Sequence, residues 1–120
     1  MGHRILLVDD SLVIRLILTR ILKPAGYEIV GEAGNGEEAL AKYKELQPDL
    51  VTMDLTMPLM MGIDAVRAIK DYDPNARIIM CSALGQKSLV IEAIEAGALN
   101  YITKPFTPQK VLSVVEAALR

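Results

Sequence analysis

The sequence predicts an α/β fold in which a parallel five-stranded sheet is covered by helices on both faces. Short β-branched and aliphatic runs, typical of buried strands, alternate strictly with segments that have the periodicity of amphipathic helices. Hydrophobic residues make up 52% of the 120 residues, which allows a substantial core. Because this length suits one compact unit, we expect a single domain over residues 1–120.

Five strands are predicted where aliphatic runs end at charged, polar or turn-forming residues. The first run is RILLV, and the third run, LVTM, ends at Asp54. The predicted strands are residues 4–8, 28–32, 50–53, 77–81 and 100–103. Their lengths are typical of strands in globular proteins.

Five helices are predicted, at residues 11–23, 37–46, 63–70, 87–96 and from Pro108 onward. Pro108 suits the first position of a helix, where a backbone N–H would have no partner in any case. The first helix has apolar residues at positions i, i+3, i+4 and i+7, so we expect these to face the core: Ile14, Ile17, Leu18 and Ile21. In the second helix the expected inward residues are Ala39, Leu40 and Tyr43.

The alternation of strands and helices also predicts the topology. Parallel neighbouring strands need crossover connections, and these are nearly always right-handed. The strand order 2-1-3-4-5 fits five such strands best. We therefore expect a flavodoxin-like (βα)5 three-layer sandwich.

Composition excludes several classes of function. The formal net charge is -2 and no cluster of Lys or Arg is present, so we expect no direct nucleic-acid binding. No apolar stretch approaches the roughly 20 residues that span a bilayer. The single cysteine, Cys81, cannot form an internal disulfide and is expected to be a small buried residue. These features predict a cytoplasmic protein without membrane insertion.

Polar residues stand where the predicted strands end. Asp9 and Asp10 follow the first strand, Asp54 the third, Ser82 the fourth and Lys104 the fifth. In an open parallel sheet the carboxyl ends of the strands form the ligand-binding edge. These side chains are therefore expected to converge.

Three neighbouring carboxylates repel one another unless a cation lies between them. Mg²⁺ suits such a set because it binds a few carboxylates and leaves positions for water and phosphate oxygens. Lys104 and Ser82 add a positive charge and a hydroxyl donor for phosphate oxygens. The set predicts a phosphoryl-transfer site. Asp54, at the end of the central strand, is the expected nucleophile.

Four segments resemble the receiver domains of two-component response regulators, across essentially the whole chain. They are LLVDDS (6–11), DLVTMDLTMPLMMG (49–62), IMCSA (79–83) and YITKPF (101–106). Residues 52–58 and 81–98 look most like the single-domain chemotaxis branch of that family. The resemblance implies that Asp54 accepts a phosphoryl group from phosphohistidine on a histidine kinase. It also implies that Asp10, Asp54 and the backbone carbonyl of Thr56 bind Mg²⁺ directly, with Asp9 acting through water and Mn²⁺ as a substitute.

The resemblance further implies a signalling switch rather than an enzyme that acts on other molecules. Such a domain catalyses only its own phosphorylation, from phosphohistidine or small phosphodonors, and its own dephosphorylation. Lys104 and Ser82 would contact the phosphoryl oxygens, and Ser82 and Tyr101 would form the switch pair. The expected partners are a histidine kinase and a flagellar motor switch protein or a phosphatase. We expect a monomer, with phosphorylation-dependent dimerisation as the alternative.

The first predicted helix is apolar on almost every side. Leu12, Val13 and Leu16 lie outside its expected core stripe. Since the first helix of this family commonly docks the helical bundle of a kinase, we interpret these residues, with Leu59, as a partner-binding patch. The competing interpretation is an apolar surface that binds nothing.

Two other classes of protein share parts of the pattern. A phosphatase of the haloacid dehalogenase type also phosphorylates an aspartate, but its two key acids stand two residues apart, whereas Asp9 and Asp10 are adjacent. A flavin-binding protein would need a phosphate-binding loop where these two acids stand. Within the switch interpretation, a phosphorelay intermediate and a receiver domain excised from a larger regulator remain open alternatives.

Overall fold

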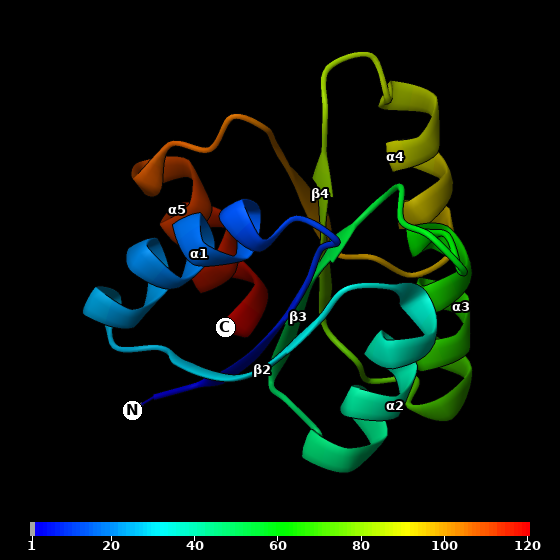
Figure 1. Ribbon diagram of the computed structural model, residues 1–120, viewed down its shortest axis with the longest axis horizontal. Coiled ribbons are helices and arrows are strands. Elements are labelled where there is room, and N and C mark those ends of the chain that lie inside the picture. Colours follow the sequence, from blue (N-terminus) through cyan, green and yellow to red (C-terminus); the bar gives the residue numbers. More distant parts are fainter. Residues whose placement is uncertain (1) are drawn as a thin grey trace.

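The computed structural model describes residues 2–120 and contains a five-stranded parallel sheet between two layers of helices (Figure 1). The strand order is β2-β1-β3-β4-β5, as predicted. The strands are β1 (Arg4–Val8), β2 (Glu28–Ala33), β3 (Leu50–Asp54), β4 (Ile78–Ser82) and β5 (Asn100–Thr103). The helices are α1 (Leu12–Leu22), α2 (Gly36–Leu46), α3 (Gly62–Tyr72), α4 (Lys87–Glu95) and α5 (Pro108–Leu119), with a short 3-10 helix at Lys23–Ala25.

The helix starts are determined by side chains that accept hydrogen bonds from backbone N–H groups. Ser11 accepts from the N–H of Ile14, so α1 begins at Leu12, one residue later than predicted. Asn35 accepts from the N–H of Glu38 in the same way, and α2 therefore begins at Gly36. Each cap satisfies a donor that has no partner within its own helix.

The two faces of the sheet support separate cores. In Figure 1, α1 and α5 lie on one face, and α2, α3 and α4 lie on the other. Alternate residues of a strand point to opposite faces, so Leu50 packs under α1 and α5 while Val51 packs under the other three helices. Cys81 is buried in the α1–α5 core, as expected. Within residues 2–120, no helix has the length and apolar character that would let it span a bilayer.

The predicted core stripe of α1 was partly wrong. Leu18 and Leu22, one turn apart, are the buried residues of this helix, and Ile14 and Ile21 are partly buried beside them. Ile17 is 39% exposed. The helix is rotated so that Leu18 and Leu22 lie over the sheet, which moves Ile17 to the edge. In a helix that is apolar on almost every side, the periodicity alone does not determine that rotation.

Candidate functional site

Three aspartates lie together at the carboxyl edge of the sheet. Asp9 and Asp10 follow β1, and Asp54 is the last residue of β3. One carboxylate oxygen from each lies within 4.8 Å of the others. Asp9 and Asp54 are buried, whereas Asp10 is exposed to solvent. The predicted convergence of these acids is confirmed.

Lys104 joins the cluster from the end of β5. Its Nζ lies 3.0 Å from Asp9 Oδ2 and 3.1 Å from Asp54 Oδ1. Its backbone N–H donates to the carbonyl of Ser82 at 2.7 Å, so the end of β4 fixes where Lys104 stands. The ammonium group therefore bridges two of the three acids.

Burial and charge shift the pKa values of this cluster. Burial, followed by the negative charge of Asp9, raises the pKa of Asp54 to about 6, although Lys104 opposes the shift. For Lys104, burial favours the neutral form, but hydrogen bonding to Asp9 and the charges of Asp54 and Asp9 outweigh it and raise the pKa. One ammonium group against three carboxylates leaves an excess of negative charge.

The residues of the cluster fit a hard divalent cation. All the side-chain donors are carboxylate oxygens, and the exposed position of Asp10 leaves one side open to water and to an incoming ligand. Burial first, and the negative charge of Asp9 second, raise the pKa of Asp54, and a bound cation would favour the charged carboxylate against both. Thr56 follows β3 by two residues and is exposed. Its backbone carbonyl stays the further ligand that the family resemblance implies.

Ser82 and Tyr101, the predicted switch pair, line the same hollow. Ser82 is buried at the end of β4, and Tyr101 in β5 is 43% exposed. The hollow has a volume of about 280 Å³ and lies between the β4–α4 loop, α4 and β5. Exposed apolar side chains also line it, among them Leu84, Ile91 and Ile94.

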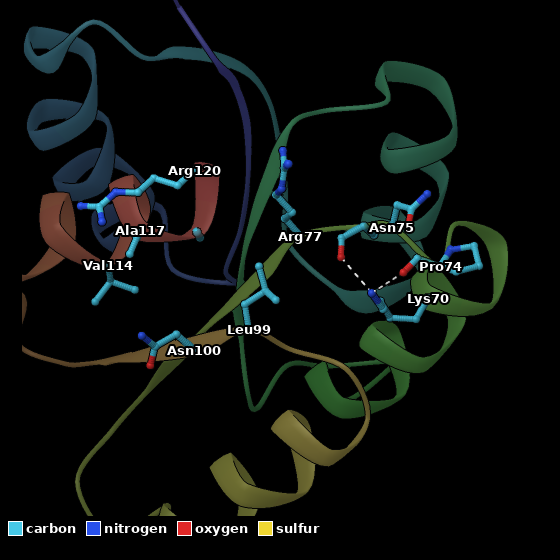
Figure 2. Close-up of a pocket in the computed structure, with 11 residues that line it drawn as sticks. Lys70, Pro74, Asn75, Arg77, Leu99, Asn100, Val114, Ala117 and Arg120 are labelled. Carbon is cyan, nitrogen blue, oxygen red and sulfur yellow. Dashed lines mark hydrogen bonds between the residues drawn. The ribbon is translucent and has the colours of Figure 1, made fainter.

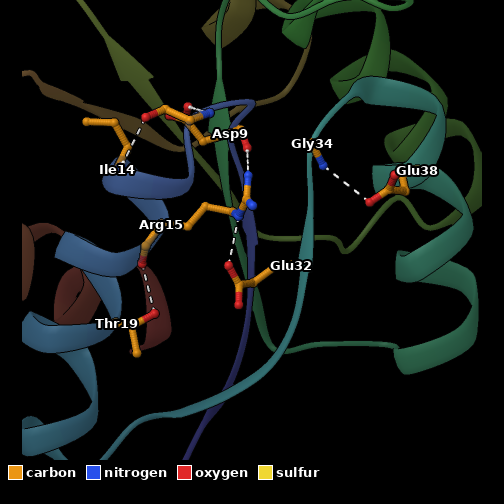
Figure 3. A network of polar contacts seen from close by, with 8 residues as sticks. Asp9, Ile14, Arg15, Thr19, Glu32, Gly34 and Glu38 are labelled. Carbon is orange, nitrogen blue, oxygen red and sulfur yellow. Dashed lines mark hydrogen bonds and ion pairs between the residues drawn. The ribbon is translucent and has the colours of Figure 1, made fainter.

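Arg15 is a residue of the site that sequence reasoning missed. Its Nη1 donates to the carbonyl oxygen of Asp9 at 2.5 Å, and its Nε donates to Glu32 Oε1 at 2.7 Å (Figure 3). Arg15 is the one charged residue in the otherwise apolar run LVIRLIL, 12–18. That interruption was the available signal, since a charge inside an apolar run needs a partner.

Gly62, at the start of α3, lets the loop that follows Asp54 pack closely. A Cβ atom at this position would overlap the backbone carbonyl of Asp54. The N–H of Gly62 donates to the carbonyl of Leu55 at 2.9 Å, which closes the loop. Residue 62 must therefore lack a side chain for β3 to end against α3.

The proposed patch on α1 is exposed. Leu12 is 67% exposed, Val13 63% and Leu16 45%, and Leu59, in the loop between β3 and α3, is also exposed. The structure thus places these residues on the surface, as the prediction requires.

A second cavity, larger than the hollow beside Ser82, has none of the three clustered aspartates among its lining residues, which Figure 2 shows. It has a volume of about 660 Å³ and is bordered by the end of α3, the loop between α3 and β4, the amino end of β5, and α5. Lys70 at its wall is already engaged, because its Nζ donates to the carbonyls of Pro74 at 2.6 Å and Ala76 at 3.1 Å. Because its lining residues stand just before β4 and at the start of β5, the cavity lies at the amino ends of these strands, whereas the candidate site lies at the carboxyl ends.

Comparison with known proteins agrees with this geometry. The family model described as response regulator receiver domain matches residues 5–116, and the chain belongs to that family. Members of the family are phosphoacceptor switches of two-component systems.

Within the family, the chain is closely similar to chemotaxis proteins CheY. The Thermotoga maritima protein is 57% identical over 96% of both chains, and the Bacillus subtilis protein is 55% identical over 99% of both. Among solved structures, the CheX-CheY-BeF3-Mg+2 complex from Borrelia burgdorferi contains a chain with a TM-score of 0.94 and 42% identity. That match covers 98% of this chain and 90% of the other. The predicted family and fold are confirmed.

Proposed function

We propose that this protein is a chemotaxis response regulator whose Asp54 accepts a phosphoryl group from a CheA-like histidine kinase. The observation that carries the proposal is the position of Asp54. It ends the central strand, its Oδ1 lies 3.1 Å from Lys104 Nζ, and its carboxylate lies beside those of Asp9 and Asp10. No other carboxylate of the cluster stands at the end of the central strand.

The transfer step follows from this arrangement. A carboxylate oxygen of Asp54 attacks the phosphorus atom of phosphohistidine, a new O–P bond forms, and the P–N bond to the imidazole breaks. The imidazole leaves with the bonding electron pair and takes up a proton from water. Lys104, which bridges Asp9 and Asp54 before transfer, would contact the phosphoryl oxygens; its distances of 3.0 Å and 3.1 Å to these two carboxylates support this role.

In this proposal Asp10, Asp54 and the Thr56 carbonyl hold Mg²⁺, Asp9 acts through water, and Mn²⁺ can substitute. When bound, Mg²⁺ supplies the charge neutralisation that phosphoryl transfer between anions requires. The oxygen-only donor set supports this, and the Borrelia burgdorferi complex contains Mg²⁺ with a CheY.

Phosphorylation then changes the surface around the hollow of α4 and β5. Ser82 would turn its hydroxyl toward the phosphoryl group, and Tyr101 would turn inward to fill the space that is vacated. The expected reader is a flagellar motor switch protein or a phosphatase. The complex of a CheY with CheX from Borrelia burgdorferi supports a protein partner of this kind. Hydrolysis of the acyl phosphate, catalysed by the domain itself, resets the switch.

We further propose that residues 1–120 act as one cytoplasmic, monomeric receiver domain, with dimerisation on phosphorylation as the alternative. A phosphorelay intermediate and a receiver excised from a larger regulator are the other proposals within the family. Capture of partners with and without beryllofluoride distinguishes them. A motor switch protein or phosphatase supports the chemotaxis role, whereas a histidine phosphotransfer domain supports the relay.

The direct test is incubation with Mg²⁺ and acetyl phosphate, followed by measurement of the intact mass. The wild type should gain one phosphoryl group, and Asp54→Asn should gain none. Asp64→Asn is the matched control, because it removes an exposed carboxylate on α3 and should be labelled like the wild type. A label that persists in Asp54→Asn would overturn the assignment.

A further inference from the structure

Arg15 connects three segments of the molecule behind the acidic cluster. Its guanidinium reaches from α1 to Glu32 in β2 and to the backbone carbonyl of Asp9 at the end of β1 (Figure 3). The side chain of Arg15 is 18% exposed, and that of Glu32 is 47% exposed. Because Asp9 is buried and Glu32 is half-exposed, the contact of Arg15 with Asp9 is better shielded from solvent than its contact with Glu32.

The geometry of this contact restrains the backbone at Asp9. The N–H of Asp9 donates to the carbonyl of Ala33 at 3.0 Å, while its own carbonyl accepts from Arg15. The side chain of Asp9 also accepts, at Oδ1, from the N–H of Ser11 at 2.9 Å. Both peptide groups that flank the Asp9 Cα are thus held in place.

The carbonyl that Arg15 holds belongs to the peptide bond between Asp9 and Asp10. The orientation of this peptide plane sets where the Cα of Asp10, and hence its exposed carboxylate, stands relative to Asp54. The structure describes no side chain that buries Asp10, so the backbone must do most of its positioning.

We propose that Arg15, oriented by Glu32, is a positioning residue that raises the affinity of the acidic cluster for its divalent cation. It does so by fixing the Asp9–Asp10 peptide rather than by contacting the cation. The planar guanidinium suits this role because it donates in two fixed directions, one to each acceptor. The inference rests on the proposed function, since it takes this cluster to be the metal site.

The direction in which Mg²⁺ affinity changes when Arg15 is replaced distinguishes positioning from simple electrostatics. A positive charge near a cation site repels the cation, so charge alone predicts that Arg15→Met binds Mg²⁺ more tightly. Positioning predicts the reverse. Arg15→Lys keeps the charge but loses the two-directional donor group, so charge alone predicts no change and positioning predicts weaker binding.

The experiment is titration calorimetry with Mg²⁺ alone. We expect Arg15→Met to weaken binding roughly tenfold, the lower end of the effect of residues that support metal ligands, and Arg15→Lys to weaken it several-fold. Glu32→Gln should have a smaller effect, because its amide oxygen still accepts from Arg15. The variant that combines Arg15→Met with Glu32→Gln should bind Mg²⁺ about as well as Arg15→Met alone, since Glu32 acts through Arg15. Arg67→Met is the matched control, because it removes an exposed arginine–aspartate pair on α3 and should bind like the wild type.

Phosphorylation by acetyl phosphate supplies a second readout. The apparent KM for Mg²⁺ should rise in Arg15→Met, while the rate at saturating Mg²⁺ should stay within about twofold of the wild type. Thermal unfolding monitors the fold of each variant; if Arg15→Met does not fold, Arg15→Lys, which keeps the charge, provides the test.

Unchanged or tighter Mg²⁺ binding in these folded variants would overturn the positioning role. A wild type that binds no Mg²⁺ and takes up no phosphoryl group would instead contradict the proposed function.

Discussion

Asp54 is an acid whose ionisation depends on its neighbours. Its carboxylate is buried beside Asp9, and together these effects raise its pKa to about 6. A nucleophile must be ionised, so Lys104 and a bound cation have to favour the charged form near neutral pH. In the proposed function, Lys104 and the cation would thus both ionise the attacking oxygen of Asp54 and neutralise the incoming phosphoryl group.

This pKa predicts a pH dependence of stability in metal-free protein. The pKa of Asp54 is 3.8 when unperturbed and about 6 in the folded protein, so the folded state binds more protons between these values. The free energy of unfolding should therefore fall as pH rises from about 4 to about 7, by about 3 kcal/mol at most. Urea unfolding in EDTA measures it.

Asp54→Asn is the reference for that measurement, because every other titrating group is common to both proteins. The wild type should lose stability relative to this variant as pH rises. A difference that does not depend on pH would contradict the raised pKa.

At the scale of elements, the loop between β3 and α3 lacks one expected stabilising feature. Met61 occupies the N-cap position of α3 with φ of -63° and ψ of 151°, and its side chain accepts no hydrogen bond from the helix. Gly62 beside it packs against the Asp54 carbonyl. The backbone is thus ready for a cap that the side chain does not supply.

Met61→Asn should therefore stabilise the protein by about 1 kcal/mol, since an Asn side chain can accept from the first turn of α3. Met61 is partly exposed, so little packing is lost. Urea unfolding measures the change, with Met61→Ala as the control that cannot cap. Equal stability of the two variants would show that this position does not act as a cap.

Helix α1 carries the exposed apolar patch of Leu12, Val13 and Leu16. Leu12→Gln combined with Leu16→Gln should slow phosphotransfer from the kinase about tenfold, because apolar contact is lost, while labelling by acetyl phosphate stays normal. Time courses with both donors measure this.

Ile91→Gln with Ile94→Gln is the control for the patch, since it removes exposed apolar surface from α4 instead. A defect in that control but not in the α1 variant would place the kinase on α4. Normal transfer in the α1 variant would leave the α1 patch without a role in docking.

At the scale of the whole molecule, the site exists only in the folded chain. Lys104 and Asp54 are 50 residues apart in the sequence, and the ion pair between them forms because β3, β4 and β5 are neighbours in the sheet. A ligand of this cluster binds the folded state and not the unfolded chain.

Mg²⁺ should therefore stabilise the protein against unfolding by an amount that grows with its concentration. The expected gain is about 2.7 kcal/mol at one hundred times the dissociation constant. Thermal unfolding with MgCl₂, compared with NaCl at equal ionic strength, measures it. Asp10→Asn should lose most of the gain, and an equal effect of both salts would refute a specific site.

Much of this architecture followed from the residues alone. The aliphatic runs and their helical spacers predicted the strand order, and Asp9, Asp54 and Lys104 were predicted to meet because each follows a strand end. Such features are local in the sequence, since a strand end and its polar residue are neighbours along the chain. The pairing rules of parallel sheets then bring them together.

Tertiary structure decided the rest. The rotation of α1 buries Leu18 and exposes Ile17, a choice that periodicity could not make because both are apolar. The contact of Arg15 with Glu32 and with the Asp9 carbonyl depends on where α1 lies against β2. The sequence by itself determined which residues form the acidic cluster. The hydrogen bonds that hold the backbone at Asp9 depend on packing between segments that are distant in the chain, and a local sequence pattern does not predict such packing.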